Sequence, residues 1–300
     1  MDEDESGEDV DIYLNLALDA LHKKLEAKIS HNEIKTHEKL SFLSKDVVFH
    51  VKLAEDLLTS LSDLEQINDL TLTLFDDEVM HLKKFKIDNA SKLTESGLQV
   101  LHGHNLQELQ ISNLVKATVN DLIESLNDWT CDNLKLLNVS NSTFVDAQKH
   151  TVVVALSKLQ NLTSLNVSGT EFNKNSLEMV MDDLKKLEQL DISNTKVREI
   201  TALLKAKDRL KSLSIAELRL SGTPSAHIDV LSQLSELRHL DISDNTAPHP
   251  HDELLETLVP NIKLNVSDFL VQCRLALPNL VSLDISGMSS CLFSSEMCQI

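Results

Sequence analysis

The side chains with the clearest capacity for chemistry are His249, His251, Asp252 and Glu253, which stand together in one short segment. Imidazole and carboxylate groups ligate metals, but a metal site needs ligands that converge, usually from more than one structural element. Prolines interleave with these histidines, and a proline-rich inserted loop contains the same residue types without a function. We therefore expect no metal site and no cofactor.

Other catalytic patterns are missing from the sequence. Its 6 glycines are scattered, so there is no phosphate-binding loop, and neither Gly-x-Ser-x-Gly nor His-Glu-x-x-His occurs. The 4 cysteines show no Cys-x-x-Cys pair, which argues against a zinc site or a disulfide framework. Cys131 and Cys273 lie in apolar stretches with nothing nearby to lower a thiol pKa. The sequence therefore predicts that the protein is not an enzyme.

Composition and net charge exclude further classes of protein function. The 300 residues are 42% hydrophobic but 3% aromatic, which predicts an aliphatic core. The net charge is −19, and this argues against a generic nucleic-acid binder or docking on an anionic membrane. The acidic start does not resemble a signal peptide, and no apolar run approaches the ~20 residues that span a bilayer. We expect a cytoplasmic or nuclear protein that is not secreted.

The main signal is an internal repeat. The phrase Leu-x-x-Leu-x-Ile/Val-Ser returns with small variations, and its copies begin at residues 82, 106, 134, 162, 187, 210, 237 and 280. Successive starts are 23 to 28 residues apart, except for a last interval of 43. This period is typical of leucine-rich repeats, in which each unit stacks on its neighbours to bury a continuous core. The pattern predicts an α/β leucine-rich-repeat solenoid of about eight repeats.

In such a repeat the leucines of each short strand point inward, and the residues between them point outward onto the concave face. One outward position becomes acidic toward the C-terminus, with Asp191, Asp241 and Asp284 as candidates for partner binding. These carboxylates would recognise a basic peptide, and the alternative is a solvated face without a partner. The full row is Lys86, Gln110, Asn138, Asn166, Asp191, Ser214, Asp241 and Asp284.

The corner after each strand departs from the common repeat pattern. Many leucine-rich repeats have an asparagine three positions after the last strand leucine, where it satisfies buried backbone groups. Here one of the eight copies has it, at Asn245. We expect the serine two positions earlier, such as Ser140 or Ser193, to take over that role.

The chain divides into four regions on these patterns. Residues 1–9 form an acidic, disordered tail, and residues 10–70 form a helical region that serves as a repeat cap or as an adaptor-docking site. In that region Ser44 is the expected N-cap of a second helix. Residues 71–288 form the solenoid, with an insertion at about 245–275, and residues 289–300 form a C-terminal tail.

Three phrases carry a resemblance to a known family. The segment 187–213 begins Leu-Glu-Gln-Leu-Asp-Ile-Ser-Asn, residues 237–244 read Leu-Arg-His-Leu-Asp-Ile-Ser-Asp, and residues 277–287 read Leu-Pro-Asn-Leu-Val-Ser-Leu-Asp-Ile-Ser-Gly. These phrases resemble the Zyg-eleven family and, more loosely, the related Zer-type proteins. The resemblance runs, more weakly, from about Asp11 to Gly287.

The resemblance implies a non-catalytic substrate-recognition subunit of a cullin-two RING ubiquitin ligase. In this family an N-terminal box binds elongin C, which pairs with elongin B, and a following box selects cullin-two. The elongin box has the form Leu-x-x-x-Cys-x-x-x-aliphatic, and the matching positions here are Asp9, Tyr13 and Ala17. The resemblance implies elongin contacts at Val10, Tyr13 and Ala17, and cullin contacts at Leu43, Val47 and Val51.

A second interpretation stays open on the sequence. The family's armadillo-like domain, which reads N-terminal degrons, has no counterpart after Gly287 in this sequence. The alternative function is therefore a leucine-rich-repeat interaction scaffold, or a truncated competitor of the full-length receptor, that no longer recruits the ligase.

Overall fold

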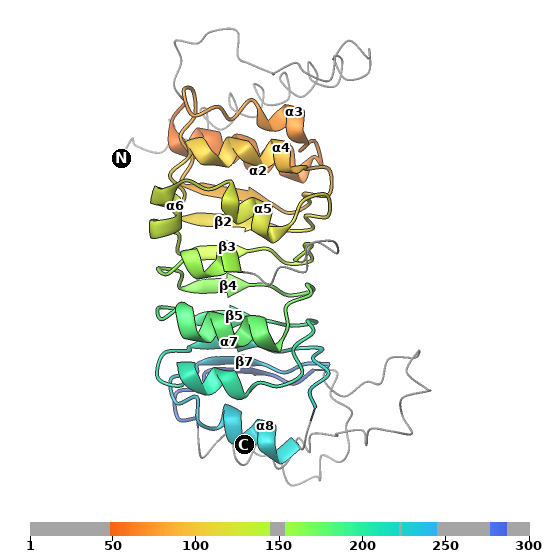
Figure 1. The fold of residues 1–300 in the computed structure, drawn as a ribbon, viewed down its shortest axis with the longest axis vertical. Coiled ribbons are helices and arrows are strands. Elements are labelled where there is room, and N and C mark those ends of the chain that lie inside the picture. Colours follow the sequence, from red (N-terminus) through yellow and green to blue (C-terminus); the bar gives the residue numbers. More distant parts are fainter. Residues whose placement is uncertain (1–48, 145–153, 222–223, 245–276, 287–300) are drawn as a thin grey trace, which may run out of the picture.

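The structure, a computed structural model, describes residues 49–144, 154–221, 224–244 and 277–286. Eight short parallel strands form one sheet in strict sequence order, and they are stacked along the long axis of the molecule (Figure 1). Each predicted copy of the repeat phrase contains one strand, so the leucine-rich-repeat solenoid is confirmed. The strands are β1 Lys84–Ile87, β2 Glu108–Ile111, β3 Leu136–Asn138, β4 Ser164–Asn166, β5 Gln189–Asp191, β6 Ser212–Ser214, β7 His239–Asp241 and β8 Ser282–Asp284.

Short helices precede β1 and connect most of the strands that follow, because neighbouring parallel strands need a crossover connection. Most of these helices have six or fewer residues, so packing rather than helix propensity stabilises them. They are α2 Val51–Asp63, α3 Asp69–Leu72, α4 Glu95–Leu98, η1 Gln99–Gly103, α5 Val119–Glu124, α6 Asp128–Asn133, η2 Val154–Lys158, α7 Lys174–Asp183, η3 Thr201–Ala206 and α8 Pro224–Leu231. Among the described residues, no helix is both long enough and apolar enough to cross a bilayer.

The core is a column of aliphatic side chains. The central residue of each strand from β1 to β7 is buried, from Phe85 to Leu240. Aromatic packing is local, and Phe144 meets Phe172 edge to face with ring centroids 5.6 Å apart. Because each strand contributes only one or two inward side chains, a repeat buries its core face only when its neighbours are in place.

Adjacent repeats are joined by the same backbone hydrogen bonds at every step. The carbonyl before each strand accepts two N–H groups from the next repeat, as when Arg238 O accepts from Val281 N at 2.8 Å and Ser282 N at 3.0 Å. From β3 to β7 the residue after the strand also donates to the next repeat, as when Ile242 N donates to Asp284 O at 3.0 Å. The register between neighbouring strands is thereby set by the backbone.

A left-handed residue turns the chain away from the sheet at most of these corners. Asn141, Asn194 and Asp244 have φ of 54°, 52° and 55°, values that asparagine and aspartate tolerate better than most residues. Gly169 occupies the same place with φ 67°, and a side chain there would collide with the carboxamide of Asn141. Each of these left-handed residues donates its N–H to the next repeat.

The expected role of the strand-end serines is confirmed at Ser193, whose Oγ accepts from Ala216 N at 3.2 Å, and other repeats use the asparagine slot. In three repeats the asparagine slot holds a hydroxyl residue, and that hydroxyl satisfies a buried backbone group. Ser142 Oγ accepts from Leu114 N at 3.0 Å, Thr170 Oγ1 donates to Val167 O at 2.6 Å, and Thr195 Oγ1 donates to Ile192 O at 2.7 Å. A hydroxyl can replace the amide because it both donates and accepts within the tight corner.

Helix α2 covers the free edge of β1. It begins at Val51 with His50 as its N-cap, because Phe49 is held extended by a bridge to Met80. The expected N-cap at Ser44, a residue outside the described ranges, is therefore wrong for this helix. On the side facing the sheet, Glu55 accepts two edge amides.

Two α2 side chains replace the hydrogen bonds that a preceding strand would supply. Glu55 Oε1 accepts from Lys83 N at 3.1 Å and from Lys84 N at 2.9 Å. Ser62 Oγ accepts from Asp88 N at 3.1 Å at the other end of the strand. Covering a sheet edge with a helix prevents unwanted strand pairing. At least α2 therefore caps the repeats, as one of the two interpretations of the N-terminal region requires.

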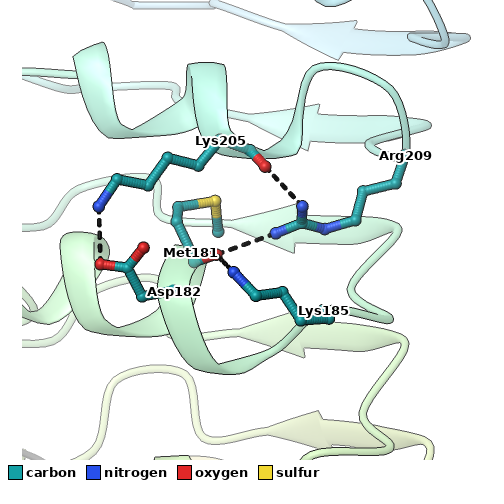
Figure 2. A network of polar contacts seen from close by, with 5 residues as sticks. All are labelled: Met181, Asp182, Lys185, Lys205 and Arg209. Carbon is teal, nitrogen blue, oxygen red and sulfur yellow. Dashed lines mark hydrogen bonds and ion pairs between the residues drawn. The ribbon is translucent and has the colours of Figure 1, made fainter.

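The last turn of α7 is tied to the following repeat by cations (Figure 2). The carbonyl of Met181 accepts from Arg209 Nη2 at 3.1 Å and from Lys185 Nζ at 3.5 Å, while Lys205 pairs with Asp182 at 2.7 Å. Positive groups at a helix C-terminus interact favourably with its unpaired carbonyls and dipole. Burial lowers the pKa of Arg209 from its usual value, and its guanidinium locks α7 against η3.

We expect the α2 cap to contribute measurably to stability. Replacing Glu55 with alanine leaves two edge amides without their carboxylate partner, so the free energy of unfolding should fall by about 1.5–3 kcal/mol. Glu55→Gln retains an acceptor oxygen and should lose less than half as much. Urea denaturation followed by circular dichroism measures both. Equal stability of Glu55→Ala and the parent protein would contradict the capping role.

His104 predicts a pH dependence of stability. Its ring is buried, Nε2 donates to Phe75 O at 2.9 Å, and burial lowers its pKa below 6.5. His104 therefore binds a proton more readily in the unfolded chain than in the folded one. The free energy of unfolding should receive the full contribution of the neutral ring above about pH 6.5, and it should decrease as the pH falls below that value. His104→Gln should flatten this part of the curve in denaturation experiments at stepped pH. An unchanged slope would show that other groups control acid sensitivity.

Candidate protein-binding face

The sheet brings the predicted polar row onto one continuous face. The leucine or phenylalanine at the centre of each strand points into the core, so the residue that follows it points the opposite way. The register places Asp191 beside Ser214, Ser214 beside Asp241, and Asp241 beside Asp284. Neighbouring strands lie about 4.8 Å apart, so the three carboxylates fall within four adjacent strands. We call the row from Lys86 to Asp284 the strand-end row.

Most members of the strand-end row from β3 onward also hold the local backbone. In each case a side-chain Oδ1 accepts the N–H of the serine two residues later, which forms an Asx turn. The distances lie between 2.8 and 3.0 Å and involve Asn138, Asn166, Asp191, Asp241 and Asp284. Asparagine and aspartate make the same bond, so the turn requires the carbonyl-type oxygen and does not require the charge.

A chain of hydroxyl groups links three repeats on this face. Ser214 Oγ donates to Asp241 Oδ2 at 2.8 Å, and Ser193 Oγ lies 2.7 Å from Ser214 Oγ. Because the single hydroxyl proton of Ser214 is committed to the carboxylate, Ser193 must donate to Ser214. Both oxygens of Asp241 are thus engaged within the protein, whereas Asp191 and Asp284 each use Oδ1 for their own turn.

The charge of the face changes along the solenoid. At β1, Lys84 pairs with Glu108 at 3.0 Å, and this hydrogen bond raises the pKa of Lys84. At the other end, the N–H of Ser286 lowers the pKa of the exposed Asp284 carboxyl, so Asp284 is ionised at neutral pH. Lys86 likewise pairs with Asp88 at 3.3 Å, so the lysines at the β1 end are neutralised by carboxylates, whereas the β8 end of the face is anionic.

One of the residues implied as ligase contacts, Val51, is among those that the structure describes. Val10, Tyr13, Ala17, Leu43 and Val47 are outside the described residues. Val51 is the first residue of α2 and is half-buried. Its place in the capping helix is compatible with either interpretation of the N-terminal region, and its contact with cullin-two stays a prediction.

Within the described part of the chain, the histidine, cysteine and carboxylate side chains do not form a catalytic or metal centre. No group of three or more histidine, cysteine or carboxylate side chains there could hold a metal. The histidine-rich segment 249–253 lies outside the described residues. Cys131 is half-buried, and burial raises its thiol pKa, which makes it a poor nucleophile at neutral pH.

Comparisons with known proteins define the class of these repeats. A family profile described as Zer-1-like leucine-rich repeats matches residues 178–296. The human and the Pongo abelii proteins named Protein zer-1 homolog are each 29% identical over 239 residues, which is 79% of this chain. The predicted resemblance is thereby confirmed for the Zer-type proteins. The chain spans 27% of the length of these relatives.

A solved structure shares the fold over nearly the whole chain. It is the yeast complex of Rad7 and Elc1, with 19% sequence identity, a TM-score of 0.51, and coverage of 96% of this chain and 75% of the matched one. At this identity the similarity supports the leucine-rich-repeat solenoid and goes no further.

The Asx turns separate the structural role of the strand-end row from its charge. Asp191→Ala removes the acceptor of the Ser193 N–H and should lower the free energy of unfolding by about 1–2 kcal/mol. Asp191→Asn keeps the acceptor, as Asn138 and Asn166 do at the same position, and should cost less than half of that. Urea denaturation of the two variants tests this. Equal losses would mean that the carboxylate charge, and not the turn, stabilises the corner.

Proposed function

We propose that this chain is the substrate-recognition subunit of a cullin-two RING ubiquitin ligase, with no catalytic centre of its own. It links elongin C, together with elongin B, and cullin-two to a target protein. The observation that carries the proposal is the Zer-1-like character of the repeats between residues 178 and 296. A subunit of this kind accelerates ubiquitin transfer by holding the target near the loaded enzyme.

The yeast structure offers an analogy for the elongin contact. It contains Rad7 in complex with Elc1, and the matched chain aligns with 96% of this one. By analogy, the elongin contact is proposed at Val10, Tyr13 and Ala17. The cullin contact is proposed at Leu43, Val47 and Val51, next to the capping helix.

The strand-end row is the proposed contact for the target. Target binding there leaves the N-terminal region free for the ligase proteins. The anionic end of the row, formed by Asp191, Asp241 and Asp284, favours a basic segment. The hydroxyl chain through Ser193 and Ser214 holds Asp241 in place, so part of the surface is organised before the target arrives.

Co-purification tests the recruiting contacts. Purified elongin B–C, with and without cullin-two, should bind residues 1–300 stoichiometrically. Tyr13→Asp and Ala17→Asp should abolish elongin binding, because a charge enters an apolar contact. Val51→Asp should reduce cullin-two binding while elongin binding persists, since an acidic residue suits the first turn of α2. Val115→Asp, an equivalent change at an exposed repeat position, is the matched control.

The same experiment distinguishes the scaffold function. Folded protein that binds neither elongin B–C nor cullin-two would refute the ligase proposal and leave an interaction scaffold. In that case a target captured by the repeats should still be lost when Asp191, Asp241 and Asp284 are all replaced by asparagine. The asparagine variants are preferred over charge reversal because they preserve the Asx turns.

A further inference from the structure

The carboxamides of Asn138 and Asn166 have a fixed orientation on the strand face. Asn138 Oδ1 accepts from Ser140 N at 3.0 Å, and Asn166 Oδ1 accepts from Ser168 N at 2.9 Å and from Ser168 Oγ at 2.7 Å. A flipped carboxamide would set two donors against each other, so these hydrogen bonds decide which atom is the nitrogen. Each Nδ2 group is therefore directed away from its own turn.

Both Nδ2 groups are available to a partner. Among the residues that the structure describes, neither group has a hydrogen-bond acceptor, and both side chains are only half-buried. The register places Asn138 beside Asn166, and neighbouring strands lie about 4.8 Å apart. Two donors at this separation can share one acceptor group, because an oxygen between them lies about 2.9 Å from each nitrogen.

The surrounding side chains favour a carboxylate as that acceptor. The chain has 47 acidic and 28 basic residues, yet the outward positions of β3 and β4 contain no acid. These positions are Leu136, Asn138, Ser164 and Asn166. On the neighbouring strand β2, Glu108 is neutralised by its ion pair with Lys84 at 3.0 Å. An incoming carboxylate therefore meets donors here, whereas like charges on adjacent positions would repel it.

The next position along the strand-end row has the opposite polarity. Asp191 lies beside Asn166, and its Oδ1 accepts from Ser193 N at 3.0 Å, so Oδ2 is the atom left to face a partner. An extended segment that crosses these strands has side chains on one face at every second residue, about 7 Å apart. A carboxylate at Asn138 and Asn166 then places the next side chain of that face near Asp191, where a lysine or arginine fits.

We propose that β3 to β5 bind a target segment with an acidic and a basic residue two positions apart. The acidic side chain lies between the Nδ2 groups of Asn138 and Asn166, and the basic one lies at Asp191. This inference rests on the proposed role of the strand-end row in target binding and names its specificity. Hydrogen bonds to an ionised group are stronger than neutral ones, and donors that are oriented before binding lose little freedom.

An NMR titration of the full chain tests the proposal, because the side-chain amides report directly on the donors. Asparagine is isotopically labelled, and each resonance is assigned by its loss in Asn138→Asp or Asn166→Asp. The probes are acetyl-Gly-Ser-Glu-Ser-Lys-Ser-Gly-amide and acetyl-Gly-Ser-Lys-Ser-Glu-Ser-Gly-amide, which present the pair in both chain directions. We expect saturable shifts of both Nδ2 resonances with one of the two probes. Exchanging its glutamate for glutamine should weaken binding about five- to tenfold.

Asn138→Asp separates the donor from the turn. The new carboxylate still accepts from Ser140 N, as Asp191 does at its own position in the row, so urea denaturation should show nearly parental stability. The preference should reverse, with the glutamine probe binding better than the glutamate probe. Asn175→Asp, the same change at an exposed position of α7 outside the row, is the matched control and should leave the preference unchanged.

Three results would overturn the proposal. They are the absence of saturable shifts with both probes, an unchanged preference in Asn138→Asp, and equal binding of the glutamate and glutamine probes. Equal binding would leave the target contact at the acidic end of the row intact, because the lysine of either probe still meets Asp191. Co-purification with elongin B–C does not depend on these residues, so the ligase proposal stands or fails separately.

Discussion

The backbone hydrogen bonds between successive repeats are the constraint on which the rest of the structure depends. Each strand is three or four residues long and is too short to be stable without its neighbours. One carbonyl before each strand, such as Lys211 O or Arg238 O, receives two amides from the next repeat. This junction sets the register, and the register aligns both the buried leucines and the exposed strand-end row. The outer face is therefore a consequence of repeat stacking.

The strand-end row shows how one side chain meets two requirements. The corner needs an acceptor for the N–H two residues ahead, and both asparagine and aspartate supply it. At β3 and β4 the row has asparagine, and at β5, β7 and β8 it has aspartate, with the same bond throughout. Either residue supplies the acceptor that the backbone needs, so the charge of the face can vary without a change of fold. A protein-binding surface of this kind can acquire specificity at little structural cost.

The repeat pattern was sufficient to predict the solenoid and the position of each strand, because its leucine spacing reports directly on inward-facing side chains. Features that depend on contacts distant in sequence could not be predicted as well. Helix α2 begins after Phe49 because Val79 and Met80 hold that residue extended. Glu55 likewise accepts from the amides of Lys83 and Lys84, which are 28 and 29 residues away from it in sequence. The Asx turns have a local sequence signal, the Asn/Asp-x-Ser spacing in the repeated phrase. The sequence analysis did not predict a turn from that spacing.

The central claim is that one end of this molecule recruits the ligase while the strand face stays free for a target. Hydrogen–deuterium exchange of the full chain, with and without elongin B–C and cullin-two, tests it most directly. The account predicts slowed exchange in peptides from residues 10–51 and unchanged exchange in peptides that contain β5 to β8. Protection centred on β5 to β8, with none near the N-terminus, would contradict it.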